Sequence, residues 1–355
     1  MDEAANAINS ICYQIAPLDE SWRAAARERQ LTLTKPPLSL GRLEEIANRI
    51  AAIQQANTPR LAKKRIYVVA GDHGVTVEGV SAYPSEVTAQ MVYNFLSGGA
   101  AINVLARHGD IEVKVVDASV DADLSGRKEL ITVKTMNGTA NFARGPAMSR
   151  TDTEAYVTAG VELARAAKAD RVDLLGVGEM GIGNTTSASA ITAALTGQDP
   201  ASLTDRGTGV DAAGVAHKTE IIRRALTVNQ PDPGDAIDIL AKVGGAEIAV
   251  MTGIIIGAAV EKIPVVADGF ISTAAAALAV ALFPNTRGYL FLAHRSVEQG
   301  HIALINFIGM QPLLDLGMRL GEGTGAALAM HLIDASAKLL CEMATFAEAA
   351  VSGKK

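Results

Sequence analysis

The chain has 355 residues, of which 49% are hydrophobic but only 4% aromatic, and its formal net charge is −6. This acidic balance, with no basic stripe, argues against a nucleic-acid-binding protein. The apolar runs at residues 248–260 and 271–283 are shorter than the ~20 residues that span a bilayer, so we expect buried helices and no membrane association. Cys12 and Cys341 lie far apart and outside any metal-ligand spacing, which favours a reduced, cytoplasmic protein.

The first 60 or so residues predict helices. "TKPPLSLGRLEEIANRIAAIQQ" places a Pro-Pro turn before an amphipathic run, with Leu43, Ile46, Ile50 and Ile53 on one face. From residue 65, short β-branched runs alternate with helical stretches, which is typical of βαβ units. The predicted strands lie in "RIYVVAGDHG", "IEVKVVDASV", "VDLLGVGEMG" (ending at Val177), "IPVVADGF" and "YLFLAHRS".

The later chain is predicted to be helical in "VEQGHIALINFI", in "PLLDLGMRL" and in the C-terminal stretch, whereas residues 121–150 are expected to form a polar loop over the crevice. The fold class predicted is α/β, a Rossmann-like, mostly parallel sheet with helices on both faces. We expect residues 64–324 to form a large α/β domain with the active site at the carboxyl ends of its strands. Residues 1–63 with 325–355 are expected to form a smaller helical lobe.

Small or polar residues follow each predicted strand. In open parallel sheets the ligand crevice lies beyond the carboxyl ends of the strands, so these residues point to one shared site. Together they favour an enzyme or a small-molecule-binding protein over a structural protein. The residues are Asp72, His73, Asp117, Ser119, Glu179, Asp268, Gly269, His294 and Ser296.

The stretch "GVGEMGIGNTTSASAI" joins a strand to a helix through a glycine turn. Asn184 and Thr185 stand at the predicted helix start, where free N–H groups and the helix dipole can hold a phosphate. The alternative is a tight turn that needs glycine only for its backbone conformation. The spacing does not match a P-loop, and no acidic residue ends a second strand about 20 residues on, which disfavours NAD binding.

Other polar residues allow more than one interpretation. His73 follows a strand and could be an acid or base, but we favour an Asp72–His73 pair that fixes the loop. Lys218 begins a helical run and would suit an anionic substrate, or it is a solvated surface lysine. The histidines show no metal-ligand spacing, so we expect no catalytic metal and no cofactor.

The turn "RLGEGTGAALA" places Glu322 between Gly321 and Gly323, just before a predicted helix. The carboxylate is either a favourable first-turn charge or a general base on a pliant backbone that lets a flat substrate approach closely. Partial desolvation by Leu320, Ala326 and Leu328 would raise its pKa towards neutrality, which suits a base.

Several motifs, taken together, resemble one family: "KPPLSLGRLE", "GDHGV", "GPAMSR", "GVGEMGIGNTT", "NQPDPGDAIDILAKVGGAEIAVMTGIIIGAA", "PVVADGF" and "MRLGEGTGAALA". They are similar to the nicotinate-nucleotide–dimethylbenzimidazole phosphoribosyltransferases, in that family's order and over nearly the whole chain. The resemblance implies transfer of the phosphoribosyl group of nicotinate mononucleotide to an aromatic base. The products would be an α-ribotide and nicotinate, in cobamide (vitamin B12) biosynthesis.

The resemblance also implies roles for individual residues. Glu322 falls on the family's catalytic glutamate, and Glu179 and Lys218 on auxiliary charged residues at the substrate. The cationic nicotinate ring is a good leaving group, so positioning and a base suffice for the chemistry. Expected substrate-binding residues are Gly181, Ile182, Gly183, Asn184 and Thr185 at the phosphate, Asp268, Gly269 and Ser296 at the ribose and phosphate, and Leu320, Gly321 and Gly323 around the glutamate.

The sequence departs from the family pattern at three positions, two of which belong to the expected pocket for the base. Tyr83 and Met91 stand where the family usually has serine and glutamine, and Leu38 stands where glycine is common. A pocket with Tyr83 and Met91 in place of serine and glutamine differs in polarity and volume, so we hypothesise a phenolic base in place of dimethylbenzimidazole. Substrate-binding roles are therefore expected for Tyr83 and Met91. The expected assembly is a homodimer, or a heterodimer with a paralogous subunit.

Two alternatives from other classes remain open at this point. One is a non-catalytic paralogue that binds the nucleotide and supports a catalytic partner. The other is an NAD-dependent oxidoreductase on a Rossmann-like sheet. The presence of Glu322 and Glu179 argues against the first alternative, and the missing acidic ribose ligand argues against the second.

Overall fold

A computed structural model describes residues 15–207 and 209–352 of the chain. Within these residues six strands form one sheet in the order β3-β2-β1-β4-β5-β6, and every neighbouring pair is parallel. The predicted parallel α/β sheet is thus confirmed. The chain order reverses between β1 and β4, and in such sheets the ligand crevice lies at this switch point. The strands are β1 (Lys64–Gly71), β2 (Ile111–Ser119), β3 (Leu130–Thr132), β4 (Leu174–Met180), β5 (Val265–Ala267) and β6 (Leu290–Leu292).

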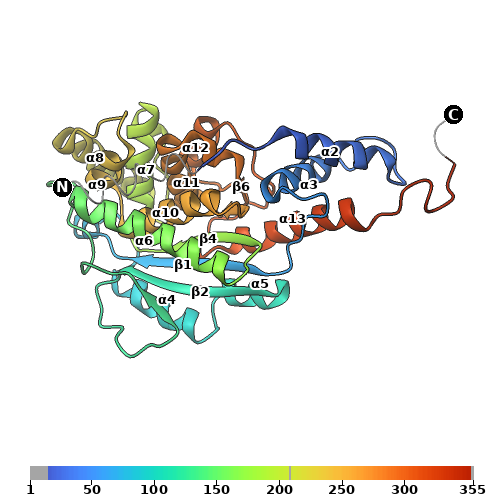
Figure 1. Ribbon diagram of the computed structural model, residues 1–355. Coiled ribbons are helices and arrows are strands. Elements are labelled where there is room, and N and C mark those ends of the chain that lie inside the picture. The colour runs from blue at the N-terminus through green and yellow to red at the C-terminus, as the bar shows by residue number, and fades with distance from the viewer. Residues whose placement is uncertain (1–14, 208, 353–355) are drawn as a thin grey trace.

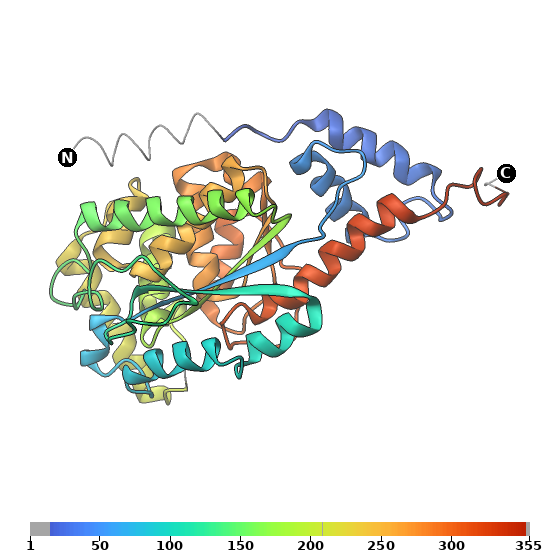
Figure 2. The same ribbon diagram turned by 60° about the horizontal axis from the view of Figure 1, so that its bottom comes forward.

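Helices cover both faces of the sheet, as the sequence predicted. Figures 1 and 2 show α6 and α10 on one side and α4 and α5 on the other, with the first half of α13 against β1, β4 and β5. The α-helices are α2 (Glu20–Thr32), α3 (Arg42–Gln54), α4 (Glu86–Leu96), α5 (Ala101–Gly109), α6 (Arg150–Ala169), α7 (Asn184–Thr196), α8 (Ala212–Asn229), α9 (Ala236–Val243), α10 (Ala246–Val260), α11 (Phe270–Leu282), α12 (Gln299–Ile308) and α13 (Thr324–Glu342). Three 3₁₀ turns are also described, η1 (Gly74–Glu78), η2 (Pro200–Ser202) and η3 (Pro284–Gly288).

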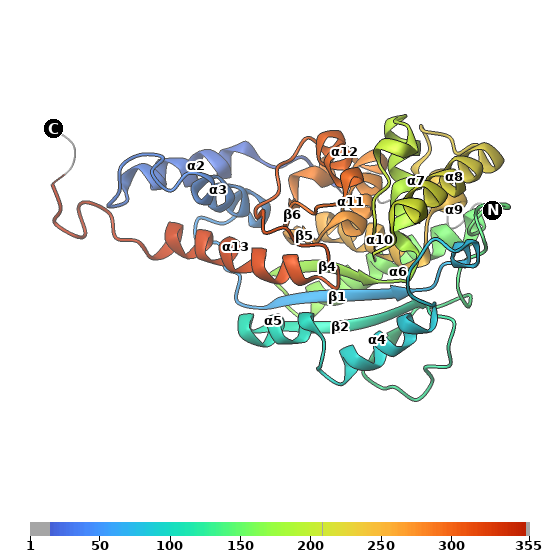
Figure 3. The ribbon, with the colours of Figure 1, turned by 180° about the vertical axis from the view of Figure 1, so that it is seen from behind.

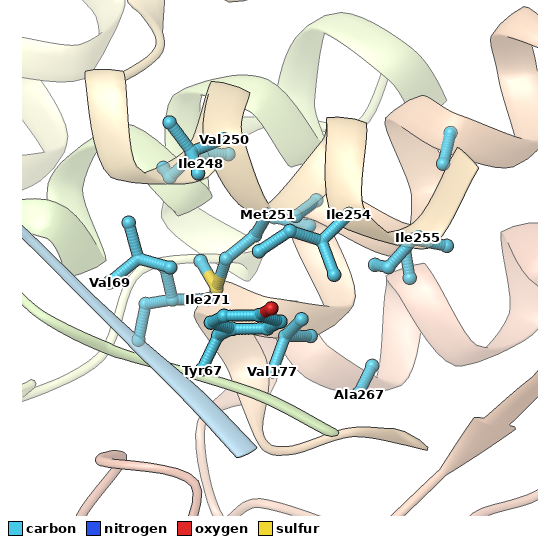
Figure 4. Close-up of a cluster of buried hydrophobic side chains, with 14 of the residues drawn as sticks. Tyr67, Val69, Val177, Ile248, Val250, Met251, Ile254, Ile255, Ala267 and Ile271 are labelled. Atoms are coloured by element: carbon cyan, nitrogen blue, oxygen red, sulfur yellow. The ribbon is translucent and has the colours of Figure 1, made fainter. Parts of the chain in front are cut away.

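The core lies between the sheet and α10. Apart from Glu247 and Thr252, this helix is apolar on all sides, and it is buried along its length, as expected for a helix packed between a sheet and other helices. In Figure 4, Met251 and Ile254 of α10 lie over the side chains of Tyr67 and Val177 from β1 and β4. The two apolar runs are therefore buried helices, α10 and α11, and no helix in the described ranges is long and apolar enough to cross a bilayer.

Helices from both ends of the chain meet beside the sheet. The second half of α13 extends away from the strands and packs on α2 and α3 (Figures 1 and 3). Arg29 of α2 donates from Nε to the carbonyl of Leu340 at 2.7 Å. Leu33 and Thr345 form an isolated antiparallel β-bridge. The division of the chain into two lobes with boundaries at residues 63/64 and 324/325 stays a prediction.

Three local expectations were wrong. The presumed loop 121–150 contains β3, which joins the sheet edge because Leu130 pairs with Val115 of β2. Strand β4 continues past Val177 to Met180, because β1 offers it a parallel partner up to Ala70. The stretch "PLLDLGMRL" is not helical.

The reason for the last difference is tertiary. Leu313 and Leu314 donate their N–H groups to Leu292 and Ala293 at 2.9 Å, which extends the chain alongside the end of β6. Gly317 then takes a left-handed conformation with φ +65. Backbone hydrogen bonds to β6 thus replace those that a helix would make within the segment.

Gly178 in β4 lies directly against the backbone of Gly323, at the start of α13. A Cβ atom at position 178 would overlap the Gly323 N and Cα atoms, which belong to backbone and cannot rotate away. This close approach brings the loop that carries Glu322 onto the end of β4.

We expect Gly178→Ala to lower the free energy of unfolding by about 1–3 kcal/mol, because the added methyl group overpacks a backbone contact. Gly145→Ala is the matched control, since a Cβ atom there meets nothing within 4 Å. Urea unfolding of both variants measures the difference. Equal midpoints for the two variants would contradict the close approach.

Candidate active site

The glycine turn after β4 lies at the switch point of the sheet. Gly183 precedes α7 with φ +95, and Asn184 and Thr185 form the first turn of the helix, as the sequence predicted. Ile182 donates its N–H to the Thr88 hydroxyl at 3.2 Å, and this hydrogen bond holds the turn against α4. Figure 3 shows α7 and α8 at the end of the sheet towards which β1 points.

Glu179 is a buried carboxyl group within the last residues of β4. Asn184 donates its side-chain amide to Glu179 Oε2, and the Glu179 carbonyl accepts the N–H of Glu322 at 3.1 Å. Burial raises the pKa of Glu179 to about 8, and the negative charges of Glu247, Asp268 and Glu322 add to the rise. At neutral pH this carboxyl group is mostly protonated.

Glu322 is also buried, on a loop between two glycines. Its Oε2 accepts the N–H of Ile102 at 3.3 Å, at the start of α5. Burial raises the pKa of the Glu322 carboxyl, and the charge of Asp268 acts in the same direction. The expectation that Leu320 helps to desolvate it was wrong, because Leu320 is 58% exposed; the loop's position between β4 and α5 buries the carboxylate instead.

The residues that follow β5 and β6 lie at the same end of the sheet, because the strands are parallel. Asp268 Oδ2 accepts the N–H of Gly323 at 3.0 Å, and its Oδ1 accepts that of Ala326 at 2.9 Å. Gly269 precedes α11. Ser296 is buried, and its N–H donates to His301 Nδ1 at 2.8 Å. Gly321 adjoins Glu179, so that a Cβ on this glycine would overlap Glu179 Oε1.

Lys218 is fully buried on α8, so the alternative of a solvated surface lysine is wrong. Its Nζ donates to the Thr185 hydroxyl at 2.7 Å, in the first turn of α7. Burial lowers the pKa of Lys218 to about 8, although Glu298 and Asp205 oppose the shift. A lysine held at a helix N-terminus suits an anionic group.

Sequence reasoning missed two charged residues near this lysine. Glu298 is buried and its charge interacts with Lys218, while Arg319 donates to the Gly207 carbonyl at 3.1 Å. Arg319 is the first residue of the motif "RLGEGTGAALA", three positions before Glu322. Its basic charge next to the expected base could have indicated a residue of the site.

Met91 and Tyr83 differ in how the structure places them. Met91 is half-buried on α4, three residues after Thr88, and residues at this spacing share one helix face. Met91 therefore lies on the side of α4 that contacts the glycine turn. Tyr83 precedes α4 and is 54% exposed, so it stands outside the buried part of the site.

The expected Asp72–His73 pair is not formed. His73 Nε2 lies 2.6 Å from Glu247 Oε1, and both side chains are fully buried. Asp72 instead accepts the N–H of Asp121 at 2.8 Å. The partner of His73 comes from the first turn of α10, far along the chain, and local sequence carries no sign of it.

Groove size alone does not locate this site. A groove of about 1330 Å³ lies between α2, α3 and η3; Leu38 lines it, but none of the expected catalytic or substrate-binding residues does. In the described ranges, no group of three or more His, Cys, Asp or Glu side chains is placed to hold a metal ion. The switch point of the sheet, with two buried carboxyl groups and a buried lysine, is the better candidate because such groups with shifted pKa values are typical of active sites.

The parallel sheet, with buried carboxyl groups and a buried lysine at its switch point, is typical of an α/β enzyme. A family model described as "Phosphoribosyltransferase" matches residues 15–351. The chain is 55% identical over 341 residues to a nicotinate-nucleotide–dimethylbenzimidazole phosphoribosyltransferase of Chloroflexus aggregans, covering 96% of this chain and 97% of the relative. A relative of the same name from Geobacter metallireducens is 56% identical over 337 residues, covering 95% and 96%.

Solved structures agree with these relatives. The crystal structure of CobT from Thermus thermophilus matches with a TM-score of 0.90 and 48% identity, over 94% of this chain and 99% of that chain. The chain therefore belongs to the nicotinate-nucleotide–dimethylbenzimidazole phosphoribosyltransferase family. It is an enzyme that transfers a phosphoribosyl group, which sets aside the non-catalytic paralogue and the NAD-dependent oxidoreductase.

We predict that Glu179→Gln stabilises the protein more at pH 8 than at pH 5. The pKa of Glu179 rises from its ordinary 4.5 to about 8 on folding, so the unfolded chain binds fewer protons between these values. The wild-type protein therefore loses a few kcal/mol of stability as the pH rises through this window, and the neutral glutamine does not.

Melting temperatures of both proteins from pH 4 to 9 measure the effect. The difference between variant and wild type should grow with pH and level off above pH 8 to 9. A difference independent of pH would show that Glu179 is not protonated in the folded protein.

Proposed function

We propose that the enzyme moves the phosphoribosyl group of nicotinate mononucleotide to an aromatic lower-ligand base in cobamide biosynthesis. The names of the relatives and the match of Glu322 to the family's catalytic position support this assignment. One structural observation carries it. Glu322 is a buried carboxylate with a raised pKa, at the switch point and next to a second buried carboxyl group.

In the proposed reaction the bond between the anomeric carbon and the nicotinate nitrogen breaks. A bond from the same carbon to a nitrogen or oxygen of the incoming base forms on the opposite face, so a β-linkage becomes an α-linkage. The incoming base loses a proton, and Glu322 takes it. A carboxylate whose pKa lies nearer neutrality is the stronger base for this step.

The phosphate group fits the start of α7. Here the positive end of the helix dipole lies beside Lys218 Nζ and the Thr185 hydroxyl, which are 2.7 Å apart. Because Glu179 is mostly protonated at neutral pH, it adds little repulsion to the anionic substrate. Gly181, Ile182, Gly183 and Asn184 complete the turn, and Gly269 and Ser296 line the ribose side of the proposed site.

The base is proposed to be phenolic. Met91 lies on the face of α4 that contacts the glycine turn, and it offers no hydrogen bond of the kind that glutamine would give a benzimidazole. Tyr83, just before α4, is a second residue that differs from the family pattern. A phenol presents one oxygen, whose proton Glu322 would remove.

The cellular compartment and the assembly of the enzyme are proposed from the same resemblance. We propose a cytoplasmic enzyme that works as a homodimer, or as a heterodimer with a paralogous subunit. The pairing of a phenol-activating chain with a paralogue would be consistent with the two departures at Tyr83 and Met91.

Glu322→Gln should lower the rate of transfer by about 10²–10⁴-fold, because glutamine cannot accept the proton. The rate is measured as nicotinate released from nicotinate mononucleotide in the presence of base. The melting temperature serves as the folding control. A variant with near-normal activity would rule out Glu322 as the base.

The purified enzyme is expected to use p-cresol with a higher kcat/KM than dimethylbenzimidazole or adenine. The double variant Tyr83→Ser with Met91→Gln should shift the preference towards dimethylbenzimidazole, because it restores the polar side chains of the family pattern. The rates with the three bases, measured for both proteins, decide the matter. A clear preference of the unaltered enzyme for dimethylbenzimidazole would refute the phenolic assignment.

A further inference from the structure

Helix α13 begins without a capping side chain of its own. The residue before it is Gly323, which has no side chain, and the first turn contains no acidic residue. Asp268, at the end of β5, supplies the missing acceptor from a distant part of the chain. Its two oxygens accept the N–H groups of Gly323 at 3.0 Å and Ala326 at 2.9 Å.

The loop that Asp268 holds carries a strained residue. Glu322 has φ +64, a left-handed conformation that costs a residue with a side chain ~1–2 kcal/mol. Such a conformation persists only where neighbouring contacts impose it. Here the Glu322 N–H is bound by the Glu179 carbonyl at 3.1 Å, and the next N–H, from Gly323, is bound by Asp268.

The surroundings of Asp268 leave little room for a substrate contact. The side chain is 1% exposed, and His294 covers it, with Nε2 3.9 Å from Asp268 Oδ1. The His294 ring itself lies between Gly269 and Gly325, where a Cβ on Gly269 would come within 3.0 Å of Nε2. The carboxylate faces the start of α13 and this ring.

We propose that Asp268 is a positioning residue that holds Glu322 in its reactive place, and that it does not bind the ribose or phosphate. This inference rests on the proposed function, because it takes Glu322 as the base. It replaces the role that the family resemblance implies for Asp268. The other residues expected at the ribose and phosphate are unaffected.

Asp268 also acts on Glu322 through its charge. The groups that face Glu322 are Glu179 from β4, Asp268 from β5 and the Ile102 N–H from α5. Burial raises the pKa of Glu322 first, the negative charge of Asp268 raises it further, and the Ile102 N–H lowers it. Neutralising Asp268 should therefore lower the pKa of Glu322 and move the acidic limb of the kcat profile to lower pH.

The test is Asp268→Asn, which keeps one oxygen acceptor for α13 but removes the charge. We expect kcat to fall about 10- to 100-fold while KM for nicotinate mononucleotide changes less than about threefold, because only the base is misplaced. The acidic limb of kcat against pH should move down. In the double variant with Glu322→Gln, the added Asp268→Asn change should cause no further loss, since both act through one group.

Other outcomes overturn the proposal. A raised KM with unchanged kcat, or additive losses in the double variant, would make Asp268 a substrate ligand. If Asp268→Asn does not fold, Asp268→Ser, a second neutral capping residue, is measured instead, and failure of both to fold would assign Asp268 to the fold alone. An active Glu322→Gln enzyme would refute the base itself, whatever the Asp268 variants do.

Discussion

The site depends on one contact, the seating of the Glu322 loop on the end of β4. Gly178 lets the Gly323 backbone approach closely, and the Glu322 N–H then binds the Glu179 carbonyl at 3.1 Å. This contact joins two segments that are far apart in the chain. It places both carboxyl groups at the switch point of a parallel sheet, where ligands of such folds bind.

Bringing these carboxyl groups together has an electrostatic consequence. Glu179, Asp268 and Glu322 are all buried, and burial raises the pKa of each. The negative charges of Asp268 and Glu322 add to the rise at Glu179, and the charge of Asp268 adds to the rise at Glu322, so the three groups cannot all be ionised at low cost. Glu179, with a pKa of about 8, carries a proton at neutral pH, and the adjacent Glu322 can remain a base.

The sequence predicted those features of the site that neighbouring residues in the chain determine. The glycine turn and the start of α7 followed from residues within one short stretch, and five of the six described strands, all but β3, followed from their β-branched runs. The predictions were wrong where a contact with a distant part of the chain determines the local structure. His73 binds Glu247, and "PLLDLGMRL" is held extended by β6, although each local pattern predicted otherwise.

By itself, the sequence determined the fold class, the family and the residue types at the strand ends, because periodicity, turn glycines and ordered motifs are properties of short segments. Only the tertiary structure decided which of those residues share hydrogen bonds and how deeply each is buried. Lys218 is a buried partner of Thr185, and Asp268 caps α13. Burial and long-range contacts set pKa values and orientation, and they depend on the packing of the whole chain.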